Sequence, residues 1–349
     1  MTIEDRPIGI GVVGLRHGAR HVRGFQQAAG STVIAVCDLD PARAQVVLDD
    51  AASGCMALTC DELLADGRVD AVVVSVPNDA HAEVVERALR AGKHVAVEKP
   101  MTTSPTRAAD LVRLAGERNL VLAALHDFRA DRAHWAAREL VRTGVLGDVY
   151  SARTVWLRRD NAPGAPKTGP WYLDRERSGG GVLMDLGTHR IDQALWMLDF
   201  PAVRELTAAT SRRLLERRDD GGGNVEDTAS GTLHLDGDVV VQVETSFLGY
   251  LPRAEEVVLE LRGTLAGLRV QNVGDSYREY QLTLFRGQDG THEKTEFPVL
   301  PDPPSLYEDF AAAVRTGGAP LCPGWQAAAV ADVIDRMYAA ADAVAAGRA

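Results

Sequence analysis

The chain has 349 residues, of which 46% are hydrophobic and 25% charged, with 33 Gly and 16 Pro. At about 100–200 residues per domain, this length predicts two domains with a sizeable core, and the composition excludes a disordered or collagen-like chain. The 38 Lys and Arg against 49 Asp and Glu give a formal net charge of −11, so we expect neither a nucleic-acid partner nor an anionic membrane surface.

The first 125 residues alternate short β-branched apolar runs with longer amphipathic segments, a pattern typical of βαβ units and a parallel sheet. Strands are predicted at residues 8–13, 32–37, 71–76, 94–97 and 120–125. Helices are predicted at about residues 18–29, 41–52, 60–66, 80–91 and 104–117. Residues 1–125 are therefore predicted to form an α/β domain with a doubly wound parallel sheet.

The pattern changes after residue 125, with helices predicted at about 131–143 and from about 182. Strands are predicted at residues 148–158, 203–209, 228–235, 238–247, 256–262, 265–271 and 279–285, with turns at Gly237 and Gly263. Residues 126–349 are thus expected to form an α+β domain with an open, mostly antiparallel sheet. Its last segments, 306–315 and 327–346, have helical periodicity and are expected to pack back on the first domain.

The cysteines and the apolar runs bear on location. The four cysteines form no Cys-x-x-Cys pair, which favours a reducing compartment over a disulfide framework or a zinc site. The first seven residues lack the basic and apolar regions of a signal peptide, and no apolar run approaches the roughly 20 residues that span a bilayer. We expect a soluble, cytoplasmic protein without a membrane partner.

A glycine-rich stretch, residues 11–19, follows the first predicted strand and opens a helix, the context in which backbone N–H groups bind a pyrophosphate. Gly14 and Ala19 match the first and last positions of G-x-G-x-x-G/A, but Arg16 stands at the second glycine position, where Gly18 is expected to restore flexibility. Asp38, 24 positions after Gly14, can bind both ribose hydroxyls. The alternative is a tight turn followed by a helix-capping Asp.

Two charges near this stretch bear on the choice of dinucleotide. Asp38 and Asp40 favour NAD, because their charges repel a 2′-phosphate. Arg16 favours NADP if its guanidinium pairs with that phosphate, but it can equally pair with the pyrophosphate or lie exposed in the turn. We predict NAD as the cofactor, with NADP as the alternative.

Polar residues also end two later predicted strands, where open α/β sheets bind ligands. Pro77 and Asn78, with His81, follow one strand, and Glu98-Lys99-Pro100 follows the next. A lysine at such a strand end can stabilise an alkoxide or carbonyl oxygen electrostatically. The alternative for an isolated lysine is a surface role.

The sequence resembles the Gfo/Idh/MocA family (glucose–fructose oxidoreductase and inositol dehydrogenase) over nearly the whole chain. The resemblance rests on these motifs and on residues 179–181, 185–192, 225–229 and 304–317. The resemblance implies an N-terminal Rossmann domain and a C-terminal open sheet through which members oligomerise, so we expect a homodimer or homotetramer. It also implies NAD(P)-dependent oxidation or reduction of a secondary alcohol on a small-molecule sugar, inositol or related polyol. The residues that it assigns to the cofactor, together with the glycine-rich stretch, are Gly14, Arg16, His17, Gly18, Ala19, Asp38, Pro77, Asn78, His81, Glu98 and Lys99.

Asp185, His189 and Asp192 are spaced four and three apart, which on an α-helix places them on one face. Hydride transfer from a carbinol carbon requires a base, and the ordinary pKa of histidine suits His189 to this task. Asp185 is expected to orient His189 or to bind a neighbouring hydroxyl. Asp192 is expected to pair with another residue, either within the helix or at an interface. The alternatives are a metal site formed by these three residues and a purely structural helix. Because members of the family work without metal, we expect no metal ion here.

One further residue departs from the family pattern, and two others have two interpretations each. Asp127 replaces an Asn of the family pattern and changes the polarity beside the nicotinamide. Arg129 either binds substrate or cofactor, or pairs with Asp127 or Asp131, and Trp171 either forms a sugar-facing wall or packs in a core or interface. The predicted catalytic residues are Lys99, Asp185 and His189, and the substrate contacts are Lys99, Arg129, Trp171, Asp185 and His189.

The prediction is therefore an NAD(P)-dependent dehydrogenase or reductase acting on CH–OH groups. Two other functions are open at this level. One is a glycosidase that uses tightly held NAD for transient oxidation. The other is a non-catalytic nicotinamide-binding sensor, since a fold does not determine a function.

Overall fold

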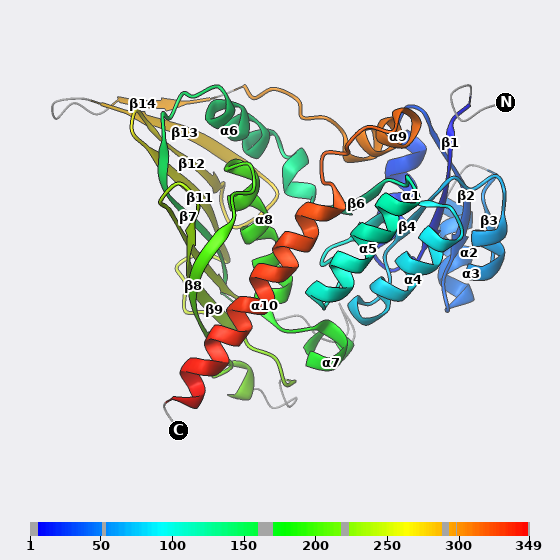
Figure 1. The fold of residues 1–349 in the computed structure, drawn as a ribbon, viewed down its shortest axis with the longest axis horizontal. Coiled ribbons are helices and arrows are strands. Elements are labelled where there is room, and N and C mark those ends of the chain that lie inside the picture. Colours follow the sequence, from blue (N-terminus) through cyan, green and yellow to red (C-terminus); the bar gives the residue numbers. More distant parts are fainter. Residues whose placement is uncertain are drawn as a thin grey trace. The chain divides into compact units, whose positions relative to one another are not determined.

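The computed structural model describes residues 6–50, 54–159, 170–217, 223–287, 293–297 and 299–347, which form two units (Figure 1). The first unit comprises Met1–Asp127 and Pro304–Ala331, and the second comprises Phe128–Pro303 and Asp332–Ala349. The C-terminal helix α10 (Gly324–Ala346) begins in the first unit and ends in the second.

A six-stranded parallel sheet forms the centre of the first unit. Its strands, in spatial order, are β3 (Met56–Ala57), β2 (Ser31–Cys37), β1 (Ile8–Val13), β4 (Ala71–Val74), β5 (His94–Glu98) and β6 (Leu122–Leu125). The order reverses between β1 and β4, so the carboxyl ends of these strands flank the switch point at which doubly wound sheets bind ligands. The predicted parallel sheet is confirmed.

Helices cover both faces of this sheet, which explains why its strands read as continuous apolar runs. They are α1 (Ala19–Gln27), α2 (Pro41–Asp50), α3 (Cys60–Ala65), α4 (Asn78–Arg90), α5 (Pro105–Glu117) and α9 (Leu306–Thr316). One core cluster joins the sheet to α1, α2 and α9, and a second joins it to α3, α4, α5 and the start of α10. All four residues of β4 are fully buried between these layers.

In the first unit, four strand ends differ from the sequence prediction by one or two residues, at β2, β4, β5 and β6, and one short strand was not predicted. β4 ends at Val74 rather than at residue 76, because the chain already turns toward α4, which begins at Asn78. β6 begins at Leu122 rather than at residue 120, because the Leu120 N–H donates to Ala115 O and closes the end of α5. The two-residue strand β3 is missing from the prediction, since so short a segment has no periodicity.

The second unit contains an eight-stranded sheet in which every pairing is antiparallel except that between β10 and β7. The strands, in spatial order, are β14 (Glu293–Glu296), β13 (Tyr280–Arg286), β12 (Gly267–Asn272), β11 (Glu255–Gly263), β7 (Val149–Arg158), β10 (Val239–Ser246), β9 (Thr228–Leu235) and β8 (Val203–Ser211). The predicted open, mostly antiparallel sheet is confirmed. The prediction missed β14, whose four side chains are all exposed and lack apolar alternation.

One face of this sheet packs against helices α6 (Arg132–Arg142) and α8 (Thr188–Met197). Strand β12 illustrates the resulting alternation, since Leu268 and Val270 are buried while the neighbouring Arg269 and Gln271 are partly exposed. Short helical turns complete the unit: η2 (Asp127–Ala130), η3 (Pro170–Leu173), α7 (Arg175–Ser178), the π-helical turn η4 (Leu183–Gly187) and η5 (Leu215–Arg217).

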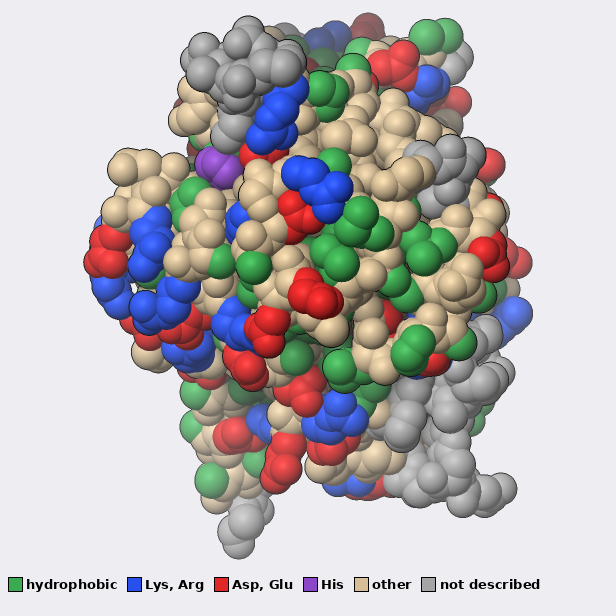
Figure 2. Space-filling view, turned by 90° about the vertical axis from the view of Figure 1, so that its right-hand side faces the viewer, with side chains coloured by type: hydrophobic (Ala, Val, Ile, Leu, Met, Phe, Trp, Pro, Cys, Tyr) green, Lys and Arg blue, Asp and Glu red, His purple; other side chains and the backbone are tan. Residues whose placement is uncertain are grey.

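Two surface properties bear on partners. On the face drawn in Figure 2, basic and acidic side chains are interspersed, and hydrophobic side chains are scattered among them. Among the described residues, we find no helix with the length and apolarity that a membrane crossing requires.

Candidate active site

The loop between β1 and α1 requires glycine at two positions. Gly14 has a positive φ of 87°, and a Cβ there would lie 2.4 Å from Ser75 O. A Cβ on Gly18 would lie 2.0 Å from Gly14 O. Gly18 has an ordinary right-handed φ of −63°, so its glycine is needed for close packing rather than for a positive φ.

The start of α1 provides an anion site of the kind found in dinucleotide-binding folds. Gly18 is the N-cap and offers no side chain to the first-turn N–H groups, and the first turn contains no acidic residue. The helix dipole favours a negative charge at this end, although the first-turn N–H groups of Ala19, Arg20 and His21 already donate to Leu15 O, His17 O and Gly18 O. Arg16 and His17 lie exposed in the same loop. These residues therefore fit the pyrophosphate of a dinucleotide.

Asp38 lies directly after β2, where its carboxylate is already partly occupied. It accepts hydrogen bonds from Leu15 N at 2.7 Å, Asp40 N at 2.9 Å and Arg43 Nη1 at 3.3 Å. A carboxylate has about four acceptor positions, so one remains for a ribose hydroxyl. Arg43, whose Nε also lies 3.4 Å from Asp40 Oδ2, is not among the residues predicted from the sequence. Its spacing of three residues from Asp40 at the start of α2 would have indicated this pair.

The residues that follow β4 have two different roles. Pro77 and Asn78 begin α4 and are partly exposed, as a ligand-facing position requires. His81, in contrast, is 1% exposed, and its ring nitrogens lie 2.7 Å from Pro100 O and 2.8 Å from Val76 O. Burial lowers its pKa, although the two carbonyls favour the charged form. The expected role of His81 in lining the cofactor is thus corrected: its side chain holds the segment that contains Lys99.

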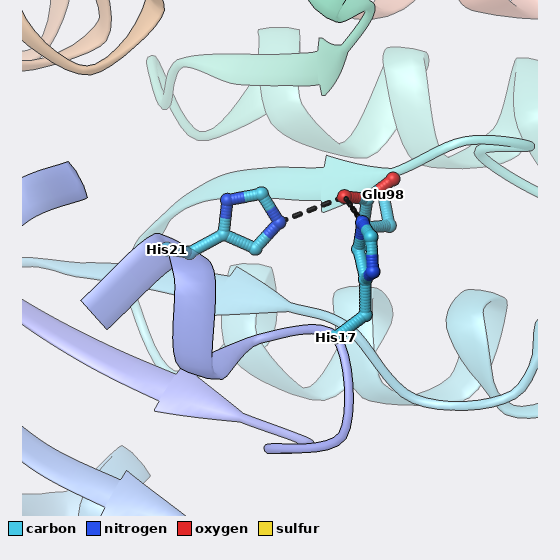
Figure 3. Close-up of side chains that lie close together, drawn as sticks. All are labelled: His17, His21 and Glu98. Atoms are coloured by element: carbon cyan, nitrogen blue, oxygen red, sulfur yellow. Dashed lines mark hydrogen bonds and ion pairs between the residues drawn. The ribbon is translucent and has the colours of Figure 1, made fainter. Parts of the chain in front are cut away.

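Glu98, the last residue of β5, is a buried carboxylate shared by two histidines (Figure 3). Its Oε1 lies 2.8 Å from His21 Nε2 and 3.3 Å from His17 Nε2, and its Oε2 accepts from Lys99 N at 3.1 Å. Burial opposes the charged form, but the hydrogen bonds from the histidines hold the pKa of Glu98 well below its usual range. Lys99 follows at the strand end and is partly exposed. The network fixes the backbone from which Lys99 projects.

Arg20 connects this network to Asp127, the residue that departs from the family pattern. Its Nη2 lies 3.8 Å from Glu98 Oε1 and 3.4 Å from Asp127 Oδ2. Burial lowers the pKa of Arg20, but the two carboxylates outweigh this effect and raise it above its ordinary value. Asp127 therefore supplies a second negative charge beside the glycine-rich loop, where the family pattern has a neutral amide.

In the second unit, Asp185 and His189 lie on consecutive turns of different type. Asp185 belongs to the π-helical turn η4, and His189 to the first turn of α8. The expectation of one regular α-helical face is wrong, because a π turn places side chains at a different angular spacing. Asp185 Oδ1 accepts a hydrogen bond from Tyr172 OH at 2.7 Å, a contact that the sequence analysis did not predict. His189 is 8% exposed, with its ring 5.1 Å from that of Phe128.

Asp192 pairs with Arg129 inside the second unit. Arg129 Nε donates to Asp192 Oδ2 at 3.0 Å, Nη2 donates to Oδ1, and both side chains are buried. The guanidinium also lies over the rings of Trp196 and Phe200. The structure thus replaces the predicted pairing of Arg129 with Asp127 or Asp131 by a bidentate pair with Asp192. Its full burial corrects the expected substrate contact, because no part of the side chain is accessible.

Trp171, the predicted sugar-facing wall, is partly exposed in η3. Its ring lies 4.9 Å from that of the neighbouring Tyr172, which binds Asp185. Most of the long loop that precedes it, residues 160–169, lies outside the described residues.

A buried carboxylate holds the turn that bears Asp185. Glu226 accepts hydrogen bonds from Gly181 N at 3.0 Å, Leu183 N at 2.9 Å and Tyr338 OH at 2.8 Å. A Cβ on Gly181 would lie 2.0 Å from Glu226 O, which explains the glycine at this position. Burial raises the pKa of Glu226, although its three donors favour the carboxylate. The sequence motif shared with the family includes Glu226, but spacing alone does not reveal these partners.

Glu226→Gln is expected to lower the free energy of unfolding by about 1–3 kcal/mol, because its amide NH₂ would face backbone N–H donors. We expect kcat to fall about ten- to a hundredfold, since the turn bearing Asp185 shifts, while NADH affinity is unchanged. Urea denaturation, steady-state kinetics and NADH fluorescence titration measure the three quantities. Tyr338→Phe removes a single donor and should cost about 0.5–1.5 kcal/mol. Unchanged kcat in Glu226→Gln would contradict the positioning role.

The comparisons with known proteins agree with this geometry. The sequence model described as "Oxidoreductase family, NAD-binding Rossmann fold" matches residues 8–126, and that described as "GFO/IDH/MocA C-terminal domain" matches residues 134–269. The chain belongs to the Gfo/Idh/MocA family. The expected membership, the Rossmann fold and the NAD-binding oxidoreductase class are thereby confirmed.

Curated relatives of this Gfo/Idh/MocA chain act on sugars, by their names. It is 29% identical over 322 residues to 1,5-anhydro-D-fructose reductase of Ensifer adhaerens, with 90% of each chain covered. It is 30% identical over 260 residues to D-glucoside 3-dehydrogenase of Escherichia coli (strain K12), covering 70% of this chain and 72% of the relative. The oxidoreductase domain protein from Kribbella flavida has the same fold, with a TM-score of 0.84 and 22% identity over 97% of this chain and 98% of that chain.

Proposed function

We propose that this oxidoreductase transfers a hydride between NAD and a secondary alcohol or ketone of a sugar, inositol or related polyol. The observation that carries the proposal is the position of Lys99, partly exposed at the carboxyl end of β5 and fixed by the Glu98 network. This strand end belongs to the same sheet as the glycine-rich loop and Asp38. The names of the curated relatives, a sugar reductase and a glucoside dehydrogenase, support the substrate class.

In the proposed reaction, the bound nicotinamide accepts or supplies the hydride. The ammonium of Lys99 stabilises the negative charge that develops on the substrate oxygen. His189 accepts the hydroxyl proton during oxidation and returns it during reduction. Asp185, itself held by Tyr172, orients His189 or binds a neighbouring hydroxyl. Trp171 is proposed to contact the apolar C–H groups of the sugar.

The proposed cofactor preference is NAD over NADP, because Asp38 has one remaining acceptor position for a ribose hydroxyl and repels a 2′-phosphate. NADH is expected to bind at least about tenfold more tightly than NADPH, a difference of about 1.4 kcal/mol. Fluorescence titrations of the purified protein with each nucleotide measure this ratio. Preference for NADPH would instead assign a phosphate to Arg16 or Arg43, and failure to bind either nucleotide would refute the proposal.

The substrate class is tested by incubating the protein with NAD and a panel of sugars, inositols and acyclic polyols. A rise in NADH absorbance with at least one member, and a keto product of matching mass, is the expected result. Release of a free sugar from a glycoside without net NADH formation would identify the glycosidase alternative. Nucleotide binding without turnover on any member would favour the sensor.

We also propose that the protein acts in the cytoplasm as a homodimer or homotetramer. None of the four cysteines, all of them described, forms a disulfide, as is usual in a reducing compartment. The sheet of the second unit has helices α6 and α8 packed on one face, and a second subunit could cover exposed side chains of the other. Light scattering would give the mass in solution, and a monomer at micromolar concentration would contradict the assembly.

A further inference from the structure

His17, His21 and Glu98 bring three metal-binding side chains together at the start of α1 (Figure 3). His17 lies in the turn before the helix, and its carbonyl accepts from Arg20 N at 3.2 Å, so the turn is continuous with α1. Residues four apart on such a turn share one side, and both rings reach the carboxylate of Glu98 at the end of β5. One possible ligand atom from each of the three side chains lies within 4.8 Å of the other two.

The two distances from Glu98 to the histidines are close to those of a tetrahedral zinc site. With metal–ligand bonds of about 2.0–2.1 Å, neighbouring ligand atoms in a tetrahedral site lie about 3.3 Å apart. The Glu98 Oε1 atom is 3.3 Å from His17 Nε2 and 2.8 Å from His21 Nε2. Two histidines and one glutamate are also a donor set that leaves a fourth position of Zn²⁺ open for water.

The surroundings supply the outer contacts that orient metal ligands. His21 Nδ1 lies 3.2 Å from Tyr307 OH, which leaves Nε2 as the metal-facing nitrogen. Glu98 Oε2 accepts from Lys99 N, which fixes the carboxylate while Oε1 faces the histidines. The Arg20 guanidinium lies 3.8 Å from Glu98 and 3.4 Å from Asp127, so the two carboxylates offset its charge.

We propose that His17, His21 and Glu98 form a binding site for a divalent transition-metal ion, best matched by Zn²⁺. His17 belongs to the loop that is proposed to bind the pyrophosphate of NAD. Its side chain cannot contact the metal ion and the pyrophosphate in the same position. Occupancy by metal therefore weakens dinucleotide binding, and by linkage the dinucleotide weakens metal binding by the same factor. This second part rests on the proposed function, whereas metal binding itself does not.

The first test titrates the chelator-treated, nucleotide-free protein with Co²⁺ and follows the visible absorption of tetrahedral Co²⁺. One equivalent per chain, displaced by Zn²⁺, is expected. His17→Ala, at the most exposed ligand, should weaken binding at least about tenfold. His234→Ala is the matched control, because His234 is an exposed histidine of β9 outside the cluster and should bind as the wild type does. Absence of stoichiometric binding, or wild-type affinity in His17→Ala, would overturn the site.

Because His21 is buried and its replacement can unfold α1, Tyr307→Phe tests this ligand indirectly. Loss of the outer hydroxyl should lower Co²⁺ affinity about 10- to 100-fold without removing a ligand. Unchanged affinity in Tyr307→Phe would refute the assigned role of His21 Nδ1. Circular dichroism of each variant confirms that the fold is retained.

The second test repeats the NADH titration with and without saturating Zn²⁺. The wild type is expected to lose NADH affinity at least about fivefold, the lower range of typical coupling between sites, and His17→Ala to lose this dependence on Zn²⁺. Equal NADH affinity in both conditions would overturn the coupling even where Co²⁺ binds. Failure of NADH to bind at all, with stoichiometric Co²⁺ binding, would refute the proposed function and leave the metal site standing.

Discussion

Lys99→Met is expected to lower kcat by about 10²–10³-fold while the Kd of NADH changes less than about threefold. The methionine side chain keeps the length and the apolar stem of lysine but removes the ammonium that stabilises the developing charge on the substrate oxygen. Lys99 is partly exposed, and the Glu98 carboxylate contacts its backbone N–H, a contact that the substitution preserves. The loss is therefore expected in turnover rather than in folding.

Steady-state kinetics on the substrate found by the panel, together with NADH fluorescence titration, separates these effects. Lys294→Met is the matched control, since Lys294 is an exposed lysine of β14 that pairs with the nearby Glu296. It should retain wild-type kcat and NADH affinity. Equal kcat in the two variants would remove Lys99 from the catalytic assignment, and a large loss of NADH affinity in Lys99→Met would assign it to cofactor binding instead.

His189→Gln provides the companion measurement, because glutamine fills a similar volume without a group that titrates near neutral pH. The expected result is a loss of kcat of about 10²–10⁴-fold together with loss of the limb of the pH profile that reports the base. A retained limb in this variant would identify another group as the base.

The fold could be predicted from the sequence where hydrophobic periodicity determines structure. Strand β9 has the predicted bounds, residues 228–235, because its last residues alternate between apolar and polar before the turn at Gly237. Strands β3 and β14 were missed for opposite reasons, one because it has only two residues and the other because all its side chains are exposed. In both cases, pairing with a neighbouring strand makes the segment extended, and that information is not local.

The candidate site was predictable in its residues but not in its contacts. Glu98 and Lys99 are identified by motif, yet the histidines that hold Glu98 come from helix α1 and the turn before it, about 80 residues earlier in the chain. The π-helical turn at Asp185 was missed because a helical spacing of residues assumes regular α geometry. Tyr172, which binds Asp185, has no feature in the sequence that distinguishes it from a packed aromatic residue.

The charge pair between Arg129 and Asp192 explains why sequence analysis cannot distinguish a buried cation from a substrate-binding one. Both residues are polar, lie near family motifs and are separated by 63 positions. The structure places both side chains out of contact with solvent, with two parallel hydrogen bonds between them. Such a pair is costly to bury but still more costly to break, because the remaining charge is left without compensation.

Arg129→Leu is therefore expected to lower the free energy of unfolding of the second unit by about 3–5 kcal/mol. Urea denaturation followed by tryptophan fluorescence is suited to this measurement, because four of the five tryptophans lie in that unit. They are Trp135, Trp156, Trp171 and Trp196. Trp196 packs against the guanidinium itself, with the charge 5.5 Å from the ring, and reports its loss directly.

Two further variants separate the buried charge from the lost packing. The double variant Arg129→Leu/Asp192→Leu removes both charges and should recover a large part of the lost stability, since apolar pairs of similar volume replace buried ion pairs well. Arg142→Leu disrupts the exposed pair with Glu139 and should change stability by less than about 1 kcal/mol. If Arg129→Leu cost no more than this control, or if the double variant were less stable than the single one, an uncompensated Asp192 charge would not be the cause. The pair would then stabilise the unit through the packing of Arg129 on Trp196 and Phe200, the two rings that it contacts.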